Sequence, residues 1–515
     1  MAKLERTKNT ISGAIWGVIE KVFSIILPFI VRTVLIKKLG SEYLGLSSLF
    51  TSILQVLNLT ELGFGAAAIY AMYKPISEDD YNTVGAIVHF LKKIYNYIGI
   101  IIIGVGICLV PFLKYLISGS IPSDINIYIL YFIYLFNTAI SYLLFAHKNS
   151  LLIALQLNKI TNKITFFCNS TMYILQIIVL FVCPNYYLYI TFLPISTIIS
   201  SIICSIIVDK KYKQWMNYST LNNDIKSNIK KKIFPLMSTK LAVVLVNSAD
   251  TLVISAFLGL NQVTIYNNYF YIMNSVSGLL IVMYSAMQSG VGNSLVVDSH
   301  EKIMKDFNKF CFLNNWIITF CTVCLLCLYQ PFMEIWVGKD MMLSFWMVIL
   351  FCLYFYATMI QRIVVIYKDA AGIWKEDMLR CYFSCTLNFV INIASVKFIG
   401  LYGVIGSSVL VSFIAIPWMA YILYKNVFKE SSKEFFIREF TNFIKMILIS
   451  FFTYFLCYFL PNGIIFFLLR ILICLIVPNL LIIFCNFRTN EFKKTTIWIK
   501  NILRNYKEKK NDQNK

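Results

Sequence analysis

Ionisable side chains inside long apolar segments are the residues of this sequence that are best suited to chemistry. In chain order they are Glu20, Lys21, Arg32, Glu61, Lys240, Asp250 and Arg470. A charge near the centre of a membrane helix costs about 2.5–3.5 kcal/mol on insertion scales. Each of these residues is therefore a candidate for binding a charged substrate or for carrying an ion.

Two lysines share one spacing to a Leu-Gly pair. Lys21 precedes Leu39-Gly40 by 18 positions, and Lys240 precedes Leu258-Gly259 by 18 positions. A helix rises about 1.5 Å per residue, so each lysine is predicted about 27 Å below a helix end at the outer face. Glu61, on a segment running inward, is predicted at a similar depth. All three groups are thus expected in one layer of the cytoplasmic half of the membrane.

These residues also have purely structural interpretations. A lysine stem can lift its ammonium to the headgroups, so Lys21 and Lys240 could be interfacial anchors. Glu61 could simply neutralise Lys21. Arg32 and Arg470 lie close enough to the outer face that a role as interfacial anchors fits the sequence as well as a functional role does. Asp250, in the outer third, is expected to pair with a neighbouring helix.

The elements that must position these residues are long apolar stretches of membrane-spanning length, about 20 residues each. We predict fourteen: 11–35, 44–73, 94–115, 127–145, 164–182, 186–208, 233–258, 265–287, 310–329, 342–364, 379–398, 401–424, 443–460 and 464–484. Of the 515 residues, 59% are hydrophobic and only 14% are charged, which excludes a water-soluble fold. The fold class is therefore an all-α integral membrane protein.

The positions of the cations predict the orientation. With both termini in the cytoplasm, most of the 46 Lys and Arg residues fall inside. Only five lie at the outer side: Lys37, Lys38, Lys114, Lys339 and Lys397. Cations in short loops are retained in the cytoplasm. The net charge of +21 accordingly indicates orientation and attraction to anionic lipids, and no nucleic-acid partner is needed to explain it.

The matching registers of the two Leu-Gly pairs suggest an internal repeat. We predict two pseudo-symmetric six-helix lobes, 1–208 and 233–424, related as parallel repeats about the membrane normal. A basic cytoplasmic linker, 209–232, joins them and carries seven lysines. Residues 425–486 would form an appended two-helix hairpin, and 487–515 a basic cytoplasmic tail.

Several other functions lack their sequence signals. No G-x-x-x-x-G-K-[ST] segment occurs, which argues against an ATP-driven pump. The acidic triplet Glu78–Asp80 could hint at a sugar-nucleotide enzyme, but such a triplet is usually a solvated turn. Cys321, Cys324 and Cys327 have C-x-x-C-x-x-C spacing without nearby His or carboxylate ligands, which favours packing over metal binding. Neither a cofactor nor an enzymatic activity is expected.

Amide side chains are frequent in three of the predicted spans. They are Asn169, Gln176, Asn267, Asn268, Asn274, Asn388 and Asn392. Amides often join one membrane helix to another. The same residues would also suit a hydrated vestibule that binds sugar hydroxyls.

The sequence of residues 7–75 resembles that of polysaccharide repeat-unit flippases of the Wzx type, within the multidrug/oligosaccharidyl-lipid/polysaccharide exporter superfamily. The segments that carry the resemblance are Leu39-Gly40 with Glu42-Tyr43-Leu44-Gly45-Leu46, and Glu61-Leu62-Gly63-Phe64-Gly65. Residues 250–268 give a weaker match. Beyond these segments the agreement is in hydropathy and in the number of spans.

The resemblance implies two helix bundles that alternate between inward- and outward-open states in the bacterial cytoplasmic membrane. The implied substrate is an oligosaccharide linked to undecaprenyl diphosphate, used for a surface polymer such as O-antigen or capsule. Cations of the central cavity would bind the diphosphate, a role that falls here to Lys21, Lys240 and Arg32. Implied partners are a polysaccharide polymerase and glycosyltransferases.

Energy supply and the alternative functions follow from residue types. A membrane carboxylate is the simplest carrier of a coupling ion, so Glu61, with Asp250 as the second choice, is predicted to couple transport. A cation-coupled multidrug exporter of the same fold is the main alternative. That substrate would favour buried carboxylates over the Lys21 and Lys240 pair. A membrane glycosyltransferase or polymerase is the third possibility.

Overall fold

In the computed structural model, residues 6–58, 64–119, 121–216, 241–246, 248–498, 500 and 504 are described. These residues form helices joined by turns and short loops, with no β-strand among them. The chain divides into two compact units. Unit 1 comprises residues 1–267 and 381–404, and unit 2 comprises residues 268–380 and 405–515.

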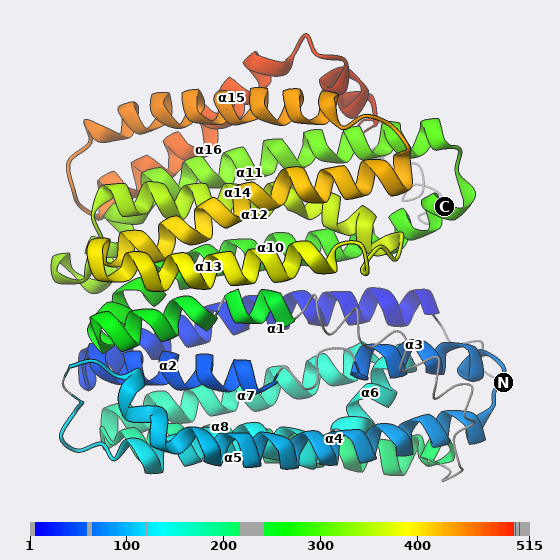
Figure 1. The fold of residues 1–515 in the computed structure, drawn as a ribbon, viewed down its shortest axis with the longest axis vertical. Coiled ribbons are helices and arrows are strands. Elements are labelled where there is room, and N and C mark those ends of the chain that lie inside the picture. Colours follow the sequence, from blue (N-terminus) through cyan, green and yellow to red (C-terminus); the bar gives the residue numbers. More distant parts are fainter. Residues whose placement is uncertain are drawn as a thin grey trace, which may run out of the picture. The chain divides into compact units, whose positions relative to one another are not determined.

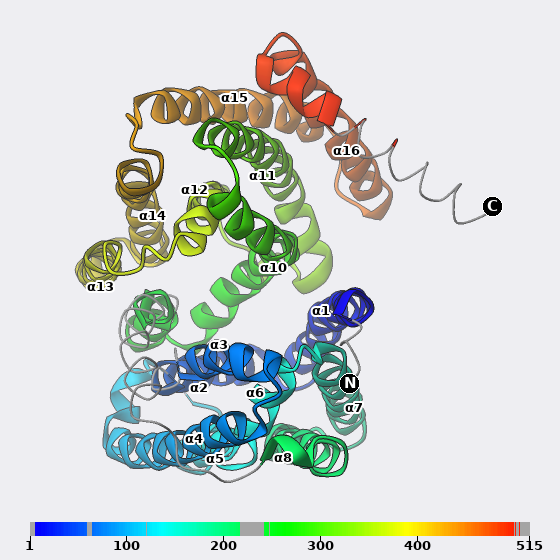
Figure 2. The same cartoon turned by 90° about the vertical axis from the view of Figure 1, so that its right-hand side faces the viewer.

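Unit 1 contains the N-terminal helices, which run side by side in Figures 1 and 2. They are α1 (Arg6–Lys38), α2 (Ser41–Leu57), α3 (Phe64–Ser77), α4 (Tyr81–Leu109), α5 (Ile127–Leu143), α6 (Ala146–Ala154), α7 (Asn158–Val182) and α8 (Tyr186–Lys211). The unit also includes the helix Leu241–Leu258 and most of α13 (Met378–Ile399). Helix α1 packs along α7, and α4 packs along α5. The core of unit 1 is apolar and includes Leu35, Phe50, Leu91 and Tyr131, all fully buried.

Unit 2 holds most of the remaining helices. They are most of α10 (Leu260–Val297), α11 (His300–Val337), α12 (Phe345–Ala370), most of α14 (Leu401–Leu423), α15 (Lys433–Tyr458) and α16 (Ile464–Asn486). Helix α11 is central to this unit, because α12, α15 and α16 all pack against it. Buried Asn315 on α11 donates a hydrogen bond of 2.8 Å to buried Glu439 on α15, which fixes one end of the α15–α16 hairpin.

Polar side chains begin several of the apolar helices. Asp80 accepts a hydrogen bond from the backbone N–H of Thr83 at the start of α4, and Asn185 does the same for Leu188 at the start of α8. The bonds from Thr83 hold the pKa of the Asp80 carboxyl below its usual value. Such caps satisfy N–H groups that the first helical turn leaves unpaired, which explains why these helices begin where they do.

Both Leu-Gly pairs end a helix, as predicted. Gly40 follows α1 with φ of 119°, and Gly259 follows the helix Leu241–Leu258 with φ of 87°. These positive φ values favour glycine. A Cβ on Gly259 would lie 2.9 Å from the carbonyl oxygen of Ser118, so that turn has no room for a side chain either.

Eleven helices of the described chain are long and apolar enough to cross a membrane, or twelve if the bent pair α5 and α6 forms one span. The protein is thus a multi-pass membrane protein. Helix α1 and the α2–α3 pair are not among those helices. Helix α1 has 33 residues and carries three of the candidate ionisable side chains, Glu20, Lys21 and Arg32. The total of fourteen spans stays a prediction.

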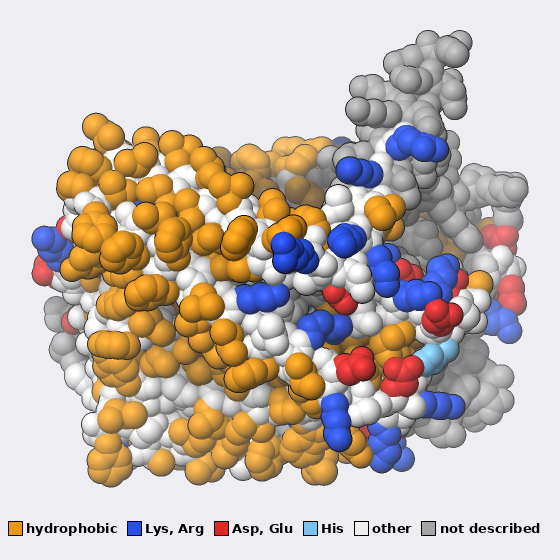
Figure 3. Space-filling view, turned by 90° about the horizontal axis from the view of Figure 1, so that it is seen from above, with side chains coloured by type: hydrophobic (Ala, Val, Ile, Leu, Met, Phe, Trp, Pro, Cys, Tyr) orange, Lys and Arg blue, Asp and Glu red, His pale blue; other side chains and the backbone are white. Residues whose placement is uncertain are grey.

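Exposed apolar side chains cover the outer faces of the helices. On α15 and α16, Phe451, Ile465 and Phe484 are each more than 70% exposed. Figure 3 shows a broad field of hydrophobic side chains, with Lys, Arg, Asp and Glu gathered toward one end. In water such a surface would aggregate, so it indicates contact with lipid.

The predicted lobe boundaries at 208 and 233 are not tested by these units. Residues 217–240, which include most of the predicted linker, lie outside the described chain. The division into 1–208, 209–232, 233–424, 425–486 and 487–515 therefore stays a prediction.

Candidate functional site

Two of the predicted substrate-binding cations, Lys21 and Arg32, lie on α1. They are 11 positions apart, which is about three helical turns, so they share one face of the helix at a spacing of about 16 Å. Both side chains are half-buried. Within the part of the chain that the structure describes, the Lys21 ammonium makes no hydrogen bond or ion pair.

The orientation of α1 is fixed by aromatic packing against α7. Trp16 and Phe23 both meet Phe166 edge to face, with ring centroids 6.0 and 5.0 Å apart. Lys163 lies over the Trp16 ring, 4.6 Å from its centroid. Aromatic pairs of this geometry contribute about 0.5–1.5 kcal/mol each beyond burial. They hold one side of α1 against α7.

Glu61 and Lys240 both lie outside the described residues. The predicted layer that they would share with Lys21, and the predicted pairing of Glu61 with Lys21, therefore stay predictions. Of the predicted cation set, the structure places Lys21 and Arg32, and of the predicted coupling carboxylates it places Asp250.

Asp250 lies on the helix Leu241–Leu258 and is 2% exposed. Its Oδ2 accepts a hydrogen bond of 3.0 Å from the Tyr266 hydroxyl on α10, and its Oδ1 accepts one of 2.7 Å from Asn392 Nδ2 on α13. The same Asn392 amide group lies 3.3 Å from Asn388 Oδ1. The expected pairing of Asp250 with neighbouring helices is therefore confirmed, and unit 1 holds a buried carboxylate within a polar network.

Two of the predicted amides, Gln176 and Asn392, join one helix to another. Gln176, 1% exposed, donates from α7 to the carbonyl oxygen of Tyr189 on α8. Asn388 and Asn392 are fully buried around Asp250. For Gln176 and Asn392 the helix-joining interpretation holds.

Arg470 on α16 also makes structural contacts, which are hydrogen bonds to backbone carbonyl groups. Its guanidinium donates to the carbonyl oxygens of Cys457 and Leu460 at the end of α15, at 3.4 and 2.6 Å. It is 6% exposed, so it is buried more deeply than an interfacial anchor would be.

Unit 1 contains a cavity of about 400 Å³, lined by both polar and apolar side chains, where α5 breaks into α6. The two helices meet at 51°, and Phe145 at the break adopts a left-handed conformation with φ of 57°. The hydroxyl and amide groups that line it include those of Ser141, Asn149, Thr161, Thr165, Ser200 and Ser201. A cavity with this lining suits a neutral polyhydroxylated group, because such a group needs many weak hydrogen bonds and no charge.

An ion pair stands beside this cavity. Lys148 on α6 donates to both carboxylate oxygens of Asp209 on α8, at 2.7 and 2.8 Å, and to the hydroxyl of Ser205 at 2.7 Å. Lys148 is 7% exposed. The pair holds α6 against α8 and so maintains the bend that opens the cavity.

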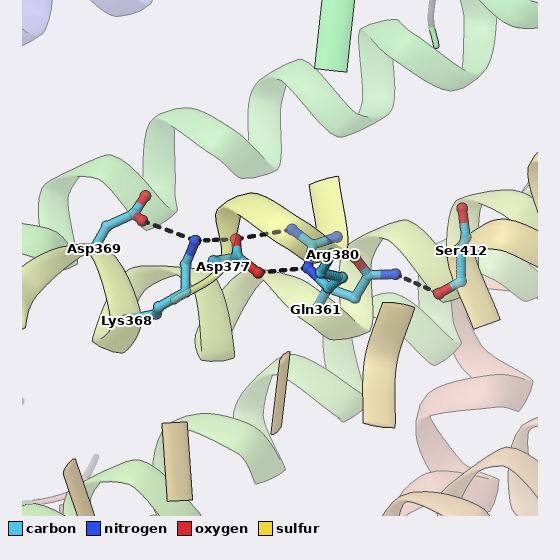
Figure 4. A network of polar contacts seen from close by, with 6 residues as sticks. All are labelled: Gln361, Lys368, Asp369, Asp377, Arg380 and Ser412. Carbon is cyan, nitrogen blue, oxygen red and sulfur yellow. Dashed lines mark hydrogen bonds and ion pairs between the residues drawn. The ribbon is translucent and has the colours of Figure 1, made fainter. Parts of the chain in front are cut away.

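A second buried ion network joins the end of α12 to the start of α13 in unit 2 (Figure 4). Asp377, 1% exposed, accepts from Lys368 at 2.5 Å and from two nitrogens of Arg380 at 2.5 and 2.9 Å. Burial alone would raise the pKa of the Asp377 carboxyl, but the bonds and charges of Arg380 and Lys368 outweigh burial and lower it. Asp369 stands 3.4 Å from Lys368. The network fixes the turn at which the chain passes from unit 2 into unit 1.

Comparison with known proteins decides the family. Residues 10–288, just over half of the chain, match the model of the family described as "polysaccharide biosynthesis protein". The chain belongs to the polysaccharide biosynthesis protein family. No curated protein matches it significantly.

Solved structures share the fold of this family member at low sequence identity. The lipid II flippase MurJ in an inward closed conformation is 17% identical with a TM-score of 0.65, over 91% of this chain and 98% of that chain. An inward-facing multidrug resistance MATE transporter of the MOP superfamily is 14% identical with a TM-score of 0.57, over 80% and 98%. The Vibrio cholerae MATE transporter VcmN in its bent form is 15% identical with a TM-score of 0.55, over 82% and 98%.

These findings confirm the resemblance and the fold class predicted from the sequence. The all-α membrane fold is shared with the lipid II flippase MurJ and with MATE transporters. The prediction of a transporter rather than an enzyme agrees with the family and with the proteins that share the fold.

Sequence reasoning missed two features of this family member. The cavity at the α5–α6 break had a weak signal, since small hydroxyl residues such as Ser141, Thr165 and Ser200 recur in the cytoplasmic halves of three predicted spans. The Asp377 network had no signal in the sequence, because an acidic residue between Lys375 and Arg380 is indistinguishable from an ordinary charged residue of a loop.

Proposed function

We propose that this protein is a flippase that moves oligosaccharides linked to undecaprenyl diphosphate from the inner to the outer leaflet of the bacterial cytoplasmic membrane. The observation that carries the proposal is the membership of residues 10–288 in the polysaccharide biosynthesis family. Glycosyltransferases would supply the substrate on the cytoplasmic side, and a polysaccharide polymerase would consume it outside. Both termini would be cytoplasmic.

Two features of unit 1 support this substrate class. The half-buried Lys21 and Arg32 on one face of α1 would bind the diphosphate through charge-assisted contacts. The hydroxyl-lined cavity at the α5–α6 break has the chemistry of a sugar site. Lys240, which directly precedes the helix Leu241–Leu258 in the sequence, would add a further cation.

Transport in proteoliposomes tests the proposal directly. Vesicles carrying a fluorescent undecaprenyl-diphosphate oligosaccharide in both leaflets are mixed with a membrane-impermeant quencher. The flippase should convert the protected half of the fluorescence to quenchable signal within minutes, whereas protein-free vesicles should not. In a parallel assay, protein-dependent release of an organic cation such as ethidium is not expected. Release of ethidium without movement of the glycolipid would instead support the multidrug exporter.

We further propose that Asp250, the second choice from the sequence, carries the coupling ion, because it is a buried carboxylate within a polar network; Glu61, the first choice from the sequence, is the alternative. The substitution Asp250→Asn removes the charge but can keep both hydrogen bonds, since the amide oxygen can accept from Asn392 and the amide nitrogen can donate to the Tyr266 hydroxyl. We expect Asp250→Asn to retain its fold and to lose the acceleration of flipping by a proton or sodium gradient.

The matched control for this experiment is Asn388→Ala, which alters the same network without removing its charge. It should keep the gradient dependence even if its rate falls. Gradient dependence of wild-type size in Asp250→Asn would show that Asp250 is a structural partner of α13, and coupling would then have to be tested with Glu61→Gln.

A further inference from the structure

Three cysteines from three different helices converge in unit 2. Cys327 on α11, Cys457 on α15 and Cys474 on α16 place their Sγ atoms within 4.8 Å of one another. All three are at most 3% exposed. The sequence pattern Cys321, Cys324 and Cys327 did not predict this cluster, because two of its members lie on the C-terminal hairpin, more than 100 residues away.

The spacing of these sulfurs suits a metal ion bound by all three. Thiolate sulfur lies about 2.3 Å from a bound zinc ion, and three sulfurs at that distance around a central ion stand about 4 Å apart. Small side-chain rotations would bring the cluster to this geometry. The three cysteines are free thiols in the structure, so their sulfur atoms are available as ligands.

A buried positive charge lies next to the cluster. Arg470 is four positions before Cys474 on α16, so the two side chains share one face. Its guanidinium donates to the carbonyl oxygen of Cys457. Its Nη1 is buried and has no hydrogen-bond partner among the residues that the structure describes. A buried cation with an unused donor is costly unless negative charge is near, and a metal-bound thiolate would supply that charge.

We propose that Cys327, Cys457 and Cys474 form a binding site for a soft monovalent metal ion, Cu⁺. Soft thiolate ligands select Cu⁺ and Zn²⁺. Structural Zn²⁺ is almost always four-coordinate. The nearest candidate for a fourth ligand, Cys324, directs its thiol to the carbonyl oxygen of Cys474 and is not within 4.8 Å of all three sulfurs. Three ligands in an apolar, water-excluding environment therefore favour Cu⁺.

The charges balance for this ion. Binding of Cu⁺ to two thiolates and one thiol releases two protons and leaves a net charge of −1 on the site. The guanidinium of Arg470 offsets this charge. The bound ion would tie the α15–α16 hairpin to α11, because each helix contributes one ligand.

The test uses the purified full chain in detergent, reduced and kept anaerobic, and titrated with Cu⁺ in competition with bicinchoninate. We expect one tightly bound Cu⁺ per chain. Cys474→Ala should weaken Cu⁺ binding at least about 100-fold. Loss of a group that only contacts a metal ligand already lowers metal affinity about 10- to 100-fold, and Cys474 is itself a ligand. Arg470→Gln should weaken Cu⁺ binding by about 10- to 100-fold. The matched control is Cys352→Ala, which removes an equally buried thiol from α12 and should bind as the wild type does.

X-ray absorption of the copper-loaded wild type keeps the test independent of how well the variants fold. It should show three sulfur neighbours at about 2.3 Å. The proposal is overturned if Cys474→Ala binds Cu⁺ as tightly as Cys352→Ala, or if copper has no sulfur shell. It is equally overturned if Zn²⁺ alone binds at one per chain, or if mass spectrometry of the isolated protein finds a disulfide between two of these cysteines.

Discussion

A variant with both Lys21→Ala and Arg32→Ala is expected to lose nearly all flipping of the diphosphate-linked glycolipid, while its amount in the membrane stays close to normal. Both side chains are half-buried on one face of α1. A hydrogen bond to a charged group contributes about 1.5–3 kcal/mol, which corresponds to roughly a 10- to 100-fold effect for each cation. Loss of both should therefore lower the flipping rate in proteoliposomes by at least about 100-fold.

The control for this variant is Lys37→Ala, which removes an exposed cation from the C-terminal end of the same helix and should flip at the wild-type rate. A Lys21→Arg variant should retain much of the wild-type flipping activity, because a positive charge remains at the same place. Wild-type flipping by the double variant, at equal abundance, would remove α1 from the binding site and leave Lys240 as the remaining predicted cation.

The second large effect is expected at the buried network of Figure 4. Asp377→Asn removes the charge that Lys368 and Arg380 share; Lys368 is buried beside it and Arg380 is part-buried. Removing one partner of a buried ion pair typically costs about 3–5 kcal/mol, because the remaining charge is left without compensation. The free energy of unfolding in mixed detergent micelles should fall by this amount.

Two further variants separate charge pairing from other effects. Asp369→Asn, on the same turn, should cost less than about 1 kcal/mol, because Asp369 is partly exposed and its contact with Lys368 is longer. A triple variant with Lys368→Met, Asp377→Leu and Arg380→Met should regain most of the lost stability, since apolar side chains can replace a buried ion network. A triple variant as unstable as Asp377→Asn would contradict the charge-pairing explanation.

The stability supplied by Asp377 should also depend on pH with a definite sign. The carboxyl has a pKa of about 3.9 when unfolded, and the pKa is lower in the folded protein. Its contribution is therefore present above about pH 4 and is lost as the pH falls through the folded value. The difference in unfolding free energy between wild type and Asp377→Asn should shrink over that range.

Much of the fold followed from local patterns in the sequence. Apolar segments predict membrane helices because each residue adds its own transfer free energy, whatever its neighbours in space. The helix ends at Gly40 and Gly259 were equally local, since a positive φ favours glycine wherever a helix stops. The family resemblance in residues 7–75 lies almost entirely within the segment that the family model matches.

The polar and metal-binding contacts depended on tertiary structure. Asn392 donates to Asp250 across 142 residues of sequence, and Cys327 meets Cys457 and Cys474 from a distant hairpin. Such contacts depend on how each helix is rotated about its axis and on which helix lies beside it. In a membrane helix that is apolar on all sides, the sequence carries little signal of that rotation, because lipid and protein interior are similarly apolar. The sequence alone therefore determined that the chain crosses the membrane and to which family it belongs, and only the packing of the helices decided which buried groups meet.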